Sequence, residues 1–198
     1  EVVVPAGVFV TGTVFLKSDL TLRLSPGAVL QGSRDPKDYP DHDISSHRKF
    51  GTITHDGVYV KSMKALVLAD RASNVAIVGE GTIKGAGEAD VFQLGLNKDG
   101  KPKNLFFIGC TDVRLSGIKV LNSAQITVSI SGCDRVRIDG VTVRSLENWN
   151  CDGIDVDAGL VTLIGNVALG NGGDGIENQG PGADMIGNRA FGNRRDIS

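Results

Sequence analysis

Apolar and polar residues alternate in short segments that recur along the chain, and most of these segments end in glycine. The clearest are NVAIVG at 74–79, DVRLSG at 112–117, RVRIDG at 135–140, LVTLIG at 160–165 and ADMIG at 183–187. Alternation of this kind is typical of a β-strand that has one side on a core and the other in water. The pattern therefore predicts many short strands and no long helix.

The spacing of these segments predicts how the strands assemble. The terminal glycines of the last four segments are 23, 25 and 22 residues apart. Such a period is typical of solenoids, in which a coil is too small to bury its own apolar side and stacking buries it. Leucine-rich repeats need regular leucines and an asparagine, and propeller blades run to about 40 residues. We therefore expect an all-β parallel β-helix of about seven or eight coils, as a single domain over residues 1–198.

Two stretches interrupt the period and are predicted to leave the stack of coils as loops, at about residues 33–57 and 96–104. Long loops on a rigid scaffold often form a binding rim. The histidines of the first loop lack the spacing of metal ligands, and lysines like those of the second usually keep a loop solvated. Both sets are therefore expected at the surface. They are His42, His47 and His55, and Lys98, Lys101 and Lys103.

The last two coils repeat almost literally, as GNVALGNGGD and GNRAFGNRRD, at an interval of 22 residues. This interval places Asn166 over Asn188 and Asn171 over Asn193. Stacked asparagines of this kind satisfy the backbone groups of turns. The repeat therefore predicts a structural asparagine ladder.

Composition and charge argue against several classes of function. The chain has 21 Lys and Arg against 23 Asp and Glu, and the basic residues are scattered, so nucleic acid is not an expected partner. No apolar run approaches the roughly 20 residues that span a bilayer, so no membrane partner is expected either. Three cysteines are too few for a disulfide framework. Cys110 and Cys133 are predicted to stack in the core as buried thiols.

Carboxylates gather near the end of the chain, around the stretch NWNCDGIDVDA. Asp152 recurs as Asp174 and as Asp196 at intervals of 22 residues, and Asp155 recurs as Glu177 at the same interval. The alternation within GIDVD turns the aspartates outward. Two adjacent columns of carboxylates are therefore predicted on one face of the solenoid.

These columns need something to offset their repulsion. Like charges about 5 Å apart repel by on the order of 3 kcal/mol at an effective dielectric near 20. A bound cation, a raised pKa on one member, or the nearby Arg194 and Arg195 would offset that cost. Two carboxylates that titrate apart are what acid/base cleavage of a glycosidic bond requires, and separations of about 6.5–9.5 Å imply inversion. The alternative is that Asp152 and Asp174, each followed by glycine, only cap turns.

Three motifs follow one another along the chain, namely VVVPAGVFVTGTVFLKSDLTLRLSPGAVLQGSRDPKDYP, NVAIVGEGTIKGAGE and NWNCDGIDVDA. In this order they resemble the polygalacturonase family of pectin-degrading glycoside hydrolases, and the resemblance covers about residues 2–158. It implies a single-stranded, right-handed parallel β-helix of the pectin-lyase-like type. It also implies a galacturonan-like acidic polysaccharide as substrate, no cofactor, and a secreted or periplasmic location.

The resemblance also suggests roles for single residues. Asn150, Cys151 and Asp152 stand in place of the family's Asn-Thr-Asp motif, which makes Asp152 the base or the residue that positions water. One coil later the family has paired aspartates, the first of which donates the proton. Here Gly173 takes that place and Asp174 remains. The family's downstream histidine and Arg-x-Lys clamp have no counterpart in this sequence, so we expect either a fragment or chimera of a longer enzyme or a rebuilt site.

The sequence thus predicts an inverting glycoside hydrolase of a galacturonan-like glycan. Its catalytic residues would be Asp152, Asp174 and Asp155, and its substrate-binding residues Glu177, Trp149, Asn150, Arg194 and Arg195. Two alternatives stay open. One is a non-catalytic carbohydrate-binding or structural β-helix, and the other is a calcium-dependent polysaccharide lyase or epimerase. Because exposed terminal coils normally need caps, end-to-end self-association is also considered.

Overall fold

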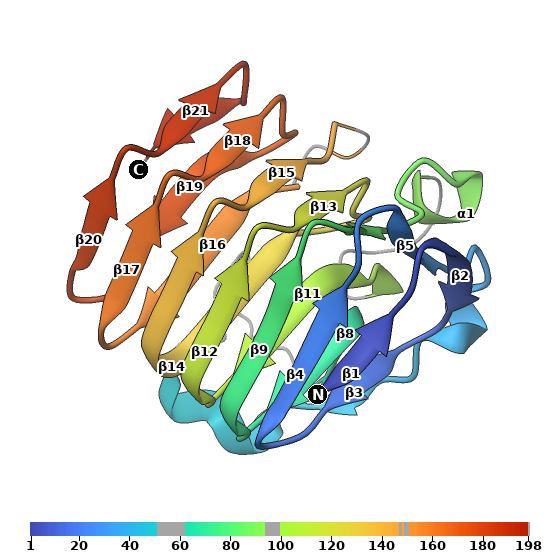
Figure 1. The fold of residues 1–198 in the computed structure, drawn as a ribbon, viewed down its shortest axis with the longest axis horizontal. Helices are drawn as coiled ribbons and strands as arrows, with labels where there is room; N and C mark the ends of the chain where they lie inside the picture. Colours follow the sequence, from blue (N-terminus) through green and yellow to red (C-terminus); the bar gives the residue numbers. More distant parts are fainter. Residues whose placement is uncertain (51–61, 94–99, 147, 149–150, 198) are drawn as a thin grey trace.

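The computed structural model describes residues 1–50, 62–93, 100–146, 148 and 151–197. Within these residues the chain winds into seven coils of parallel strands, each coil crossing three sheets that run along the solenoid (Figure 1). We call them sheets A, B and C, in the order in which each coil crosses them. Sheets A and C join through one long bent strand, β14. The predicted right-handed parallel β-helix of about seven or eight coils is confirmed, with seven coils in the described residues.

The three sheets contain seven strands each, if β14 is counted in both A and C. Sheet A contains β1 (Val2–Val4), β4 (Leu20–Leu24), β9 (Ser73–Gly79), β12 (Thr111–Ser116), the second part of β14 (Val128–Asp139), β17 (Val161–Ile164) and β20 (Ala183–Ile186). Sheet B contains β2 (Gly7–Thr11), β5 (Ala28–Gly32), β10 (Thr82–Lys84), β13 (Lys119–Leu121), β15 (Thr142–Arg144), β18 (Val167–Leu169) and β21 (Arg189–Phe191). Sheet C contains β3 (Val14–Leu16), β8 (Ala65–Asp70), β11 (Lys103–Ile108), the first part of β14, β16 (Ile154–Ala158), β19 (Asp174–Asn178) and β22 (Arg195–Ile197).

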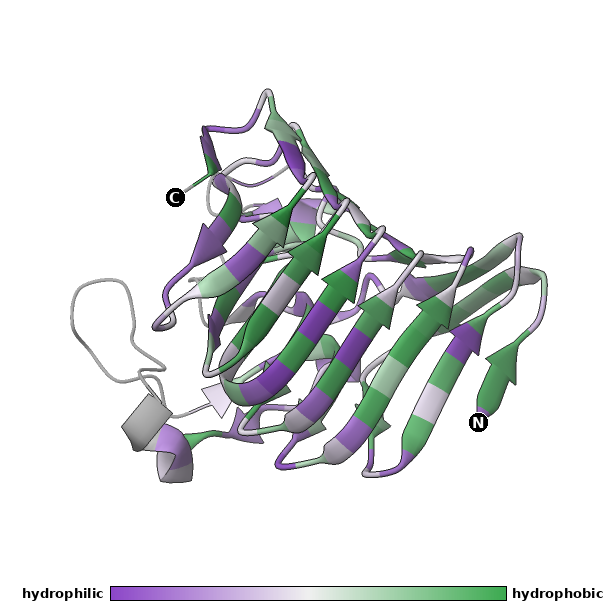
Figure 2. Ribbon diagram, turned by 60° about the vertical axis from the view of Figure 1, so that its left-hand side comes forward, coloured by the Kyte–Doolittle hydropathy of each residue, from purple (hydrophilic) through white to green (hydrophobic). Residues whose placement is uncertain are grey.

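The alternating segments of the sequence pack as their pattern predicts. Val113 and Leu115 of β12 lie beside Val136 and Ile138 of β14, and all four side chains are buried in the central core. Figure 2 shows hydrophobic and hydrophilic bands alternating along the strands. The glycines that end these segments turn the chain between sheets with positive φ, which only glycine adopts at little cost. The glycines are Gly117, Gly140, Gly165 and Gly187, with φ between 61° and 75°.

The asparagine ladder is present as predicted. The backbone N–H of Asn166 donates to Oδ1 of Asn188 at 3.0 Å, and that of Asn171 donates to Oδ1 of Asn193 at 2.8 Å. The side chain of Asn171 also accepts the backbone N–H of Ser145 at 2.9 Å. The ladder thus holds the last coils in register through the turns between the sheets.

Two excursions leave the coils. The first contains η1 (Pro36–Asp38), β6 (His42–Asp43), η2 (Ser45–Phe50) and β7 (Ser62–Met63), and β6 pairs with β7 in antiparallel fashion. The second contains the short helix α1 (Asp90–Gln93). We call residues 36–50 with 62–63 the strap. Ile44 and Met63 of the strap pack with Leu68, Phe106 and Ile108 of sheet C, so the strap covers the outer face of this sheet in the first coils.

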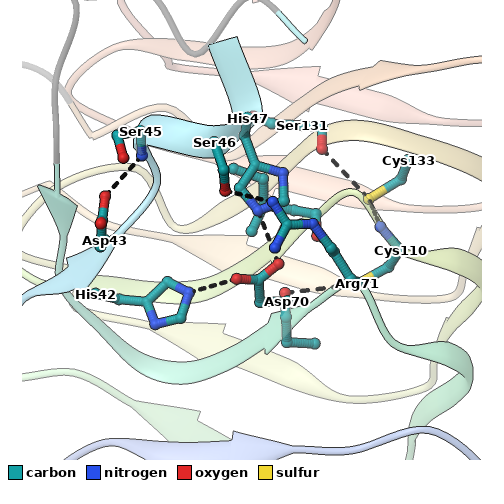
Figure 3. A network of polar contacts seen from close by, with 12 residues as sticks. His42, Asp43, Ser45, Ser46, His47, Asp70, Arg71, Cys110, Ser131 and Cys133 are labelled. Atoms are coloured by element: carbon teal, nitrogen blue, oxygen red, sulfur yellow. Dashed lines mark hydrogen bonds and ion pairs between the residues drawn. The ribbon is translucent and has the colours of Figure 1, made fainter. Parts of the chain in front are cut away.

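A pair of histidines ties the strap to the end of β8 (Figure 3). Nε2 of His42 lies 2.7 Å from one oxygen of Asp70, and Nε2 of His47 lies 2.8 Å from the other. His47 is fully buried, so its expected surface position is wrong. The reason is the carboxylate of Asp70, a partner that the spacing of the histidines does not reveal. His55 lies outside the described residues.

The predicted stacking of two thiols in the core is confirmed. Cys110 and Cys133 are both buried and both free, and the backbone N–H of Cys110 donates to Sγ of Cys133 at 3.3 Å (Figure 3). Close by, the guanidinium of Arg71 donates to the hydroxyl of Ser46 in the strap. These contacts lie at the corner between sheets C and A.

Candidate active site

The outer face of sheet C is apolar in the first coils of the solenoid and acidic in the last ones. Phe106, Ser129, Asp155 and Glu177 are neighbours in one column across β11, β14, β16 and β19. Its first part is apolar and lies under the strap, whereas its last part carries carboxylates. The predicted pairing of Asp155 with Glu177 is confirmed. A polar site therefore lies beyond the covered part of the sheet.

Three carboxylates converge at this site. One side-chain oxygen from each of Asp152, Asp155 and Glu177 lies within 4.8 Å of the other two. All three side chains are partly buried between the last coils. Their nearest oxygens are closer than the separation of about 6.5–9.5 Å expected for an inverting pair. This spacing does not support inversion, which stays a prediction that the structure does not test.

The backbone of the next coil orients Asp152. The N–H of Asp174 donates to Oδ1 of Asp152 at 2.8 Å. The chain approaches closely here, because a Cβ added at Gly173 would lie only 1.9 Å from the same oxygen. Gly173, which stands where the resemblance implies the acid, thus leaves the room that the carboxylate of Asp152 occupies.

Asp155 is the carboxyl group with the most altered acidity. Its pKa is raised to about 7: burial is the largest cause, the charge of Lys103 opposes the rise, and the neighbouring Glu177, Asp152 and Asp157 add to it. Nε2 of Gln179 donates to Oδ1 of Asp155 at 3.2 Å. A carboxyl group with this pKa holds a proton that it can donate near neutral pH.

The pKa values of the two flanking acids, Glu177 and Asp157, are also raised. Burial raises the pKa of Glu177, with Asp152 and Asp174 adding to the rise and Gln179 and Arg195 opposing it. Burial alone raises the pKa of Asp157. The group therefore relieves its mutual repulsion partly by holding protons.

Lys103 supplies a buried cation that sequence reasoning missed. It begins β11, its Nζ donates to Oγ of Ser129 at 2.8 Å, and it lies 4.7 Å from the ring centroid of Phe106. Its expected surface position is wrong, because the strand begins before the apolar run LFFI rather than at it. A lysine two residues before the four apolar residues of a strand was the available signal. Lys98 lies outside the described residues.

The register of the last coil corrects the predicted columns. Arg195, and not Asp196, lies beside Asp174 in the pairing of β19 with β22. The last coil is one residue shorter at this point, and Oδ1 of Asp196 instead accepts the N–H of Asn193 at 3.3 Å. Nε of Arg195 lies 3.8 Å from Oδ1 of Asp174, and the Arg195 side chain is 76% exposed. This contact leaves an exposed cation at the edge of the site.

The remaining predicted residues contribute less to the described geometry. The side chain of Arg194 is exposed, and its backbone N–H donates to the carbonyl of Gly173 at 3.0 Å. Trp149 and Asn150 lie outside the described residues. As a donor set, Asp152, Asp155 and Glu177 offer three of the six to eight oxygens that Ca²⁺ takes.

Comparison with known proteins relates this chain to one family of glycosyl hydrolases. Residues 2–185 match the model of the family "Glycosyl hydrolases family 28". An exo-poly-alpha-D-galacturonosidase of Dickeya chrysanthemi is 40% identical over 91 residues, which are 42% of this chain and 14% of that protein. A Vitis vinifera protein named "Probable polygalacturonase" is 29% identical over 178 residues, 88% of this chain and 35% of that protein. The chain thus spans about a third or less of the length of these relatives.

Among solved structures, the family 28 exopolygalacturonase of Yersinia enterocolitica superposes with a TM-score of 0.71 at 21% identity. The match covers 94% of this chain and 42% of that one, and at this identity it supports the fold. Across the described residues, none of the helices has the length and apolar character needed to cross a membrane.

Proposed function

The chain belongs to glycosyl hydrolase family 28, and from this premise we propose that it cleaves a galacturonan-like acidic polysaccharide by acid/base hydrolysis. One observation carries the proposal. Asp155, whose pKa is raised to about 7, lies within 4.8 Å of Asp152, which a backbone N–H orients. Two carboxyl groups with different environments in one site are what this reaction requires.

In the proposed reaction Asp155 donates its proton to the glycosidic oxygen as the bond from that oxygen to the anomeric carbon breaks. Asp152 accepts a proton from a water molecule whose oxygen forms the new bond to that carbon. Each event releases one new reducing end. Burial mainly raises the pKa of Asp155 and the charge of Glu177 adds to the rise, while Asp174 positions Asp152 through its backbone N–H. This assignment moves the proton donor from Asp174 to Asp155.

Binding of an acidic sugar needs a cation at the site. Arg195 is exposed beside Asp174 and is the proposed partner of a substrate carboxylate. Since such a polysaccharide lies outside the cell, we also propose a secreted or periplasmic location.

The test is incubation of the protein with polygalacturonate and with neutral glycans, with and without calcium. Reducing ends and the ultraviolet absorbance of unsaturated products are followed together. We expect reducing ends from polygalacturonate alone, without absorbance and without dependence on calcium. Absorbance that needs calcium would instead identify a lyase, and binding without any product would identify a carbohydrate-binding β-helix.

Asp152→Asn is the matched variant for this assay. It removes the base and keeps an oxygen that can accept the N–H of Asp174, so the fold should be spared. We expect turnover to fall by at least about 10²-fold. Turnover at the parent rate would remove Asp152 from the mechanism.

A further inference from the structure

The outer face of sheet B carries cations and no acid in its last five coils. Buried residues of β10, β13, β15 and β18 alternate with outward-facing ones, which form two columns along the sheet. The cations are Lys84, Lys119, Arg144 and Arg189. The other six outward positions of these coils are threonine, leucine, valine or phenylalanine. Figure 1 shows β13, β15, β18 and β21 following one another along the upper edge of the solenoid.

The arginines on the outer face of sheet A form ion pairs with neighbouring acids. Nε of Arg137 lies 3.0 Å from Asp139, and Nε of Arg114 lies 3.9 Å from the same carboxylate. Arg23 pairs with Glu1 at 2.9 Å. The four cations of sheet B, by contrast, form no ion pair with any described residue. No acid among the described residues neutralises these four cations, so their charge can attract an anionic partner to this face.

Three of the four cations of sheet B lie on successive coils, and Arg189 follows two coils further along. Lys84 and Arg144 share one column two coils apart, and Lys119 lies on the coil between them in the neighbouring column. With strands about 4.8 Å apart, one cation follows another at each coil in this stretch. A polymer with a carboxylate on every unit can meet such a row repeatedly, whereas a small anion can meet only one or two of its cations.

The side chains between the cations narrow the class of polymer. The leucine, valine and threonine side chains offer aliphatic contact and hydroxyl groups that can hydrogen-bond to sugar hydroxyls. A protein surface that binds nucleic acid usually has denser positive charge and aromatic rings on which the bases stack. On this part of the face the one aromatic ring is Phe191, in the last coil, with Arg189 at 5.8 Å from its centroid.

We propose that the outer face of sheet B binds a chain of an anionic polysaccharide along the solenoid axis, as a second surface separate from the carboxylate site on sheet C. The choice of a polyuronate as the polymer rests on the proposed function, while the row of cations does not. Arg144 ends β15, and the chain then runs through residues 145–151 to Asp152. Ser145, which follows Arg144, accepts the backbone N–H of Gly172 at 2.9 Å, so this end of the face lies close to the turn that contains Gly173.

The test measures binding of polygalacturonate by affinity electrophoresis at two salt concentrations. Every protein carries Asp152→Asn, so that the polymer stays intact. The test variant is Lys119→Gln with Arg144→Gln. The control is Lys17→Gln with Arg114→Gln, which removes one lysine and one arginine from exposed positions elsewhere and changes the net charge equally. We expect about fivefold weaker binding or more for the test variant, a shallower dependence on salt, and less than about twofold change for the control.

Three outcomes would overturn the proposal. They are equal losses in the two variants, equal binding of fully methyl-esterified polymer, and equally tight binding of double-stranded DNA. Hydrolysis of a short oligogalacturonate by the two double variants, with Asp152 restored, separates this inference from the proposed function. If that hydrolysis is absent while the loss of polymer binding is seen, the face binds polymer and the catalytic proposal alone fails.

Discussion

The backbone N–H of Asp174 donates to Oδ1 of Asp152 over 2.8 Å, and the turn at Gly173 passes so close that an added Cβ would lie 1.9 Å from that oxygen. Gly173→Ala should therefore displace the carboxylate of Asp152. Because Oδ1 ends a side chain that can rotate away, we expect little loss of stability, under about 1 kcal/mol. Misplacement of a reacting group by about 1 Å can cost 10²-fold, so kcat should fall by about 10–100-fold.

The matched control for this change is Gly182→Ala, because a Cβ there would meet nothing within 4 Å. Steady-state kinetics on polygalacturonate and thermal unfolding compare the two variants. Equal kcat values for both would show that the position of Asp152 does not depend on Gly173.

The raised pKa of Asp155 predicts how activity depends on pH. As the proton donor, Asp155 must be protonated in the free enzyme, and its pKa is about 7. The ratio kcat/KM should therefore fall as the pH rises through about 7. Asp155→Asn should lower turnover by about 10²–10⁴-fold and remove this limb of the profile. A limb that survives in the variant would assign the proton donor to another group.

The same raised pKa of Asp155 predicts that the stability of the fold also falls as the pH rises. The folded protein holds the Asp155 proton more tightly than the unfolded chain, in which the pKa is about 3.9. The stabilisation is fully present below about pH 4 and is lost as the pH rises to about 7. Asp155→Asn, which stays neutral, should thus raise the free energy of unfolding at about pH 8 by about 1–3 kcal/mol and change it little at about pH 4. Urea unfolding at both pH values measures the difference.

The parts of the fold that follow from local pattern were predictable. Alternation within a segment decides which residues face inward, and the period decides which residues stack, so the pairing of Asp155 with Glu177 and of Asn171 with Asn193 could be expected. Both properties depend on neighbouring residues and on a constant coil length. Predictions made from these two properties are therefore correct wherever the coil length is constant.

The predictions that were wrong depend on contacts between distant segments or on a change in coil length. His47 is buried because Asp70 lies opposite it, and Lys103 is buried because Ser129 of a later coil accepts its hydrogen bond. Arg195 replaces Asp196 beside Asp174 because the last coil is one residue shorter there. None of these relations leaves a periodic trace in the sequence.

The asparagine ladder predicts a graded loss of stability. Asn171 is almost fully buried, and its Oδ1 accepts the backbone N–H of Ser145 at 2.9 Å. Asn171→Ala leaves that buried donor without this acceptor, which costs about 1–3 kcal/mol. Asn193→Ala, on the more exposed last coil, should cost less. Thermal unfolding of the two variants checks the order, and an equal or reversed order would contradict a ladder that works through buried backbone groups.

The position of Lys103 predicts how the pH profile of kcat/KM would shift if this lysine were replaced. Its charge lowers the pKa of Asp155, against the burial that raises it. Lys103→Met keeps an unbranched side chain over Phe106 and removes the charge, so the pKa of Asp155 should rise further. The alkaline limb of kcat/KM should then move to higher pH. Lys101→Met is the control, because Nζ of Lys101 donates to Asn148 at 3.0 Å and its charge is not among those acting on Asp155. A limb that stays in place in Lys103→Met, or moves as far in Lys101→Met, would mean that the limb does not report the titration of Asp155.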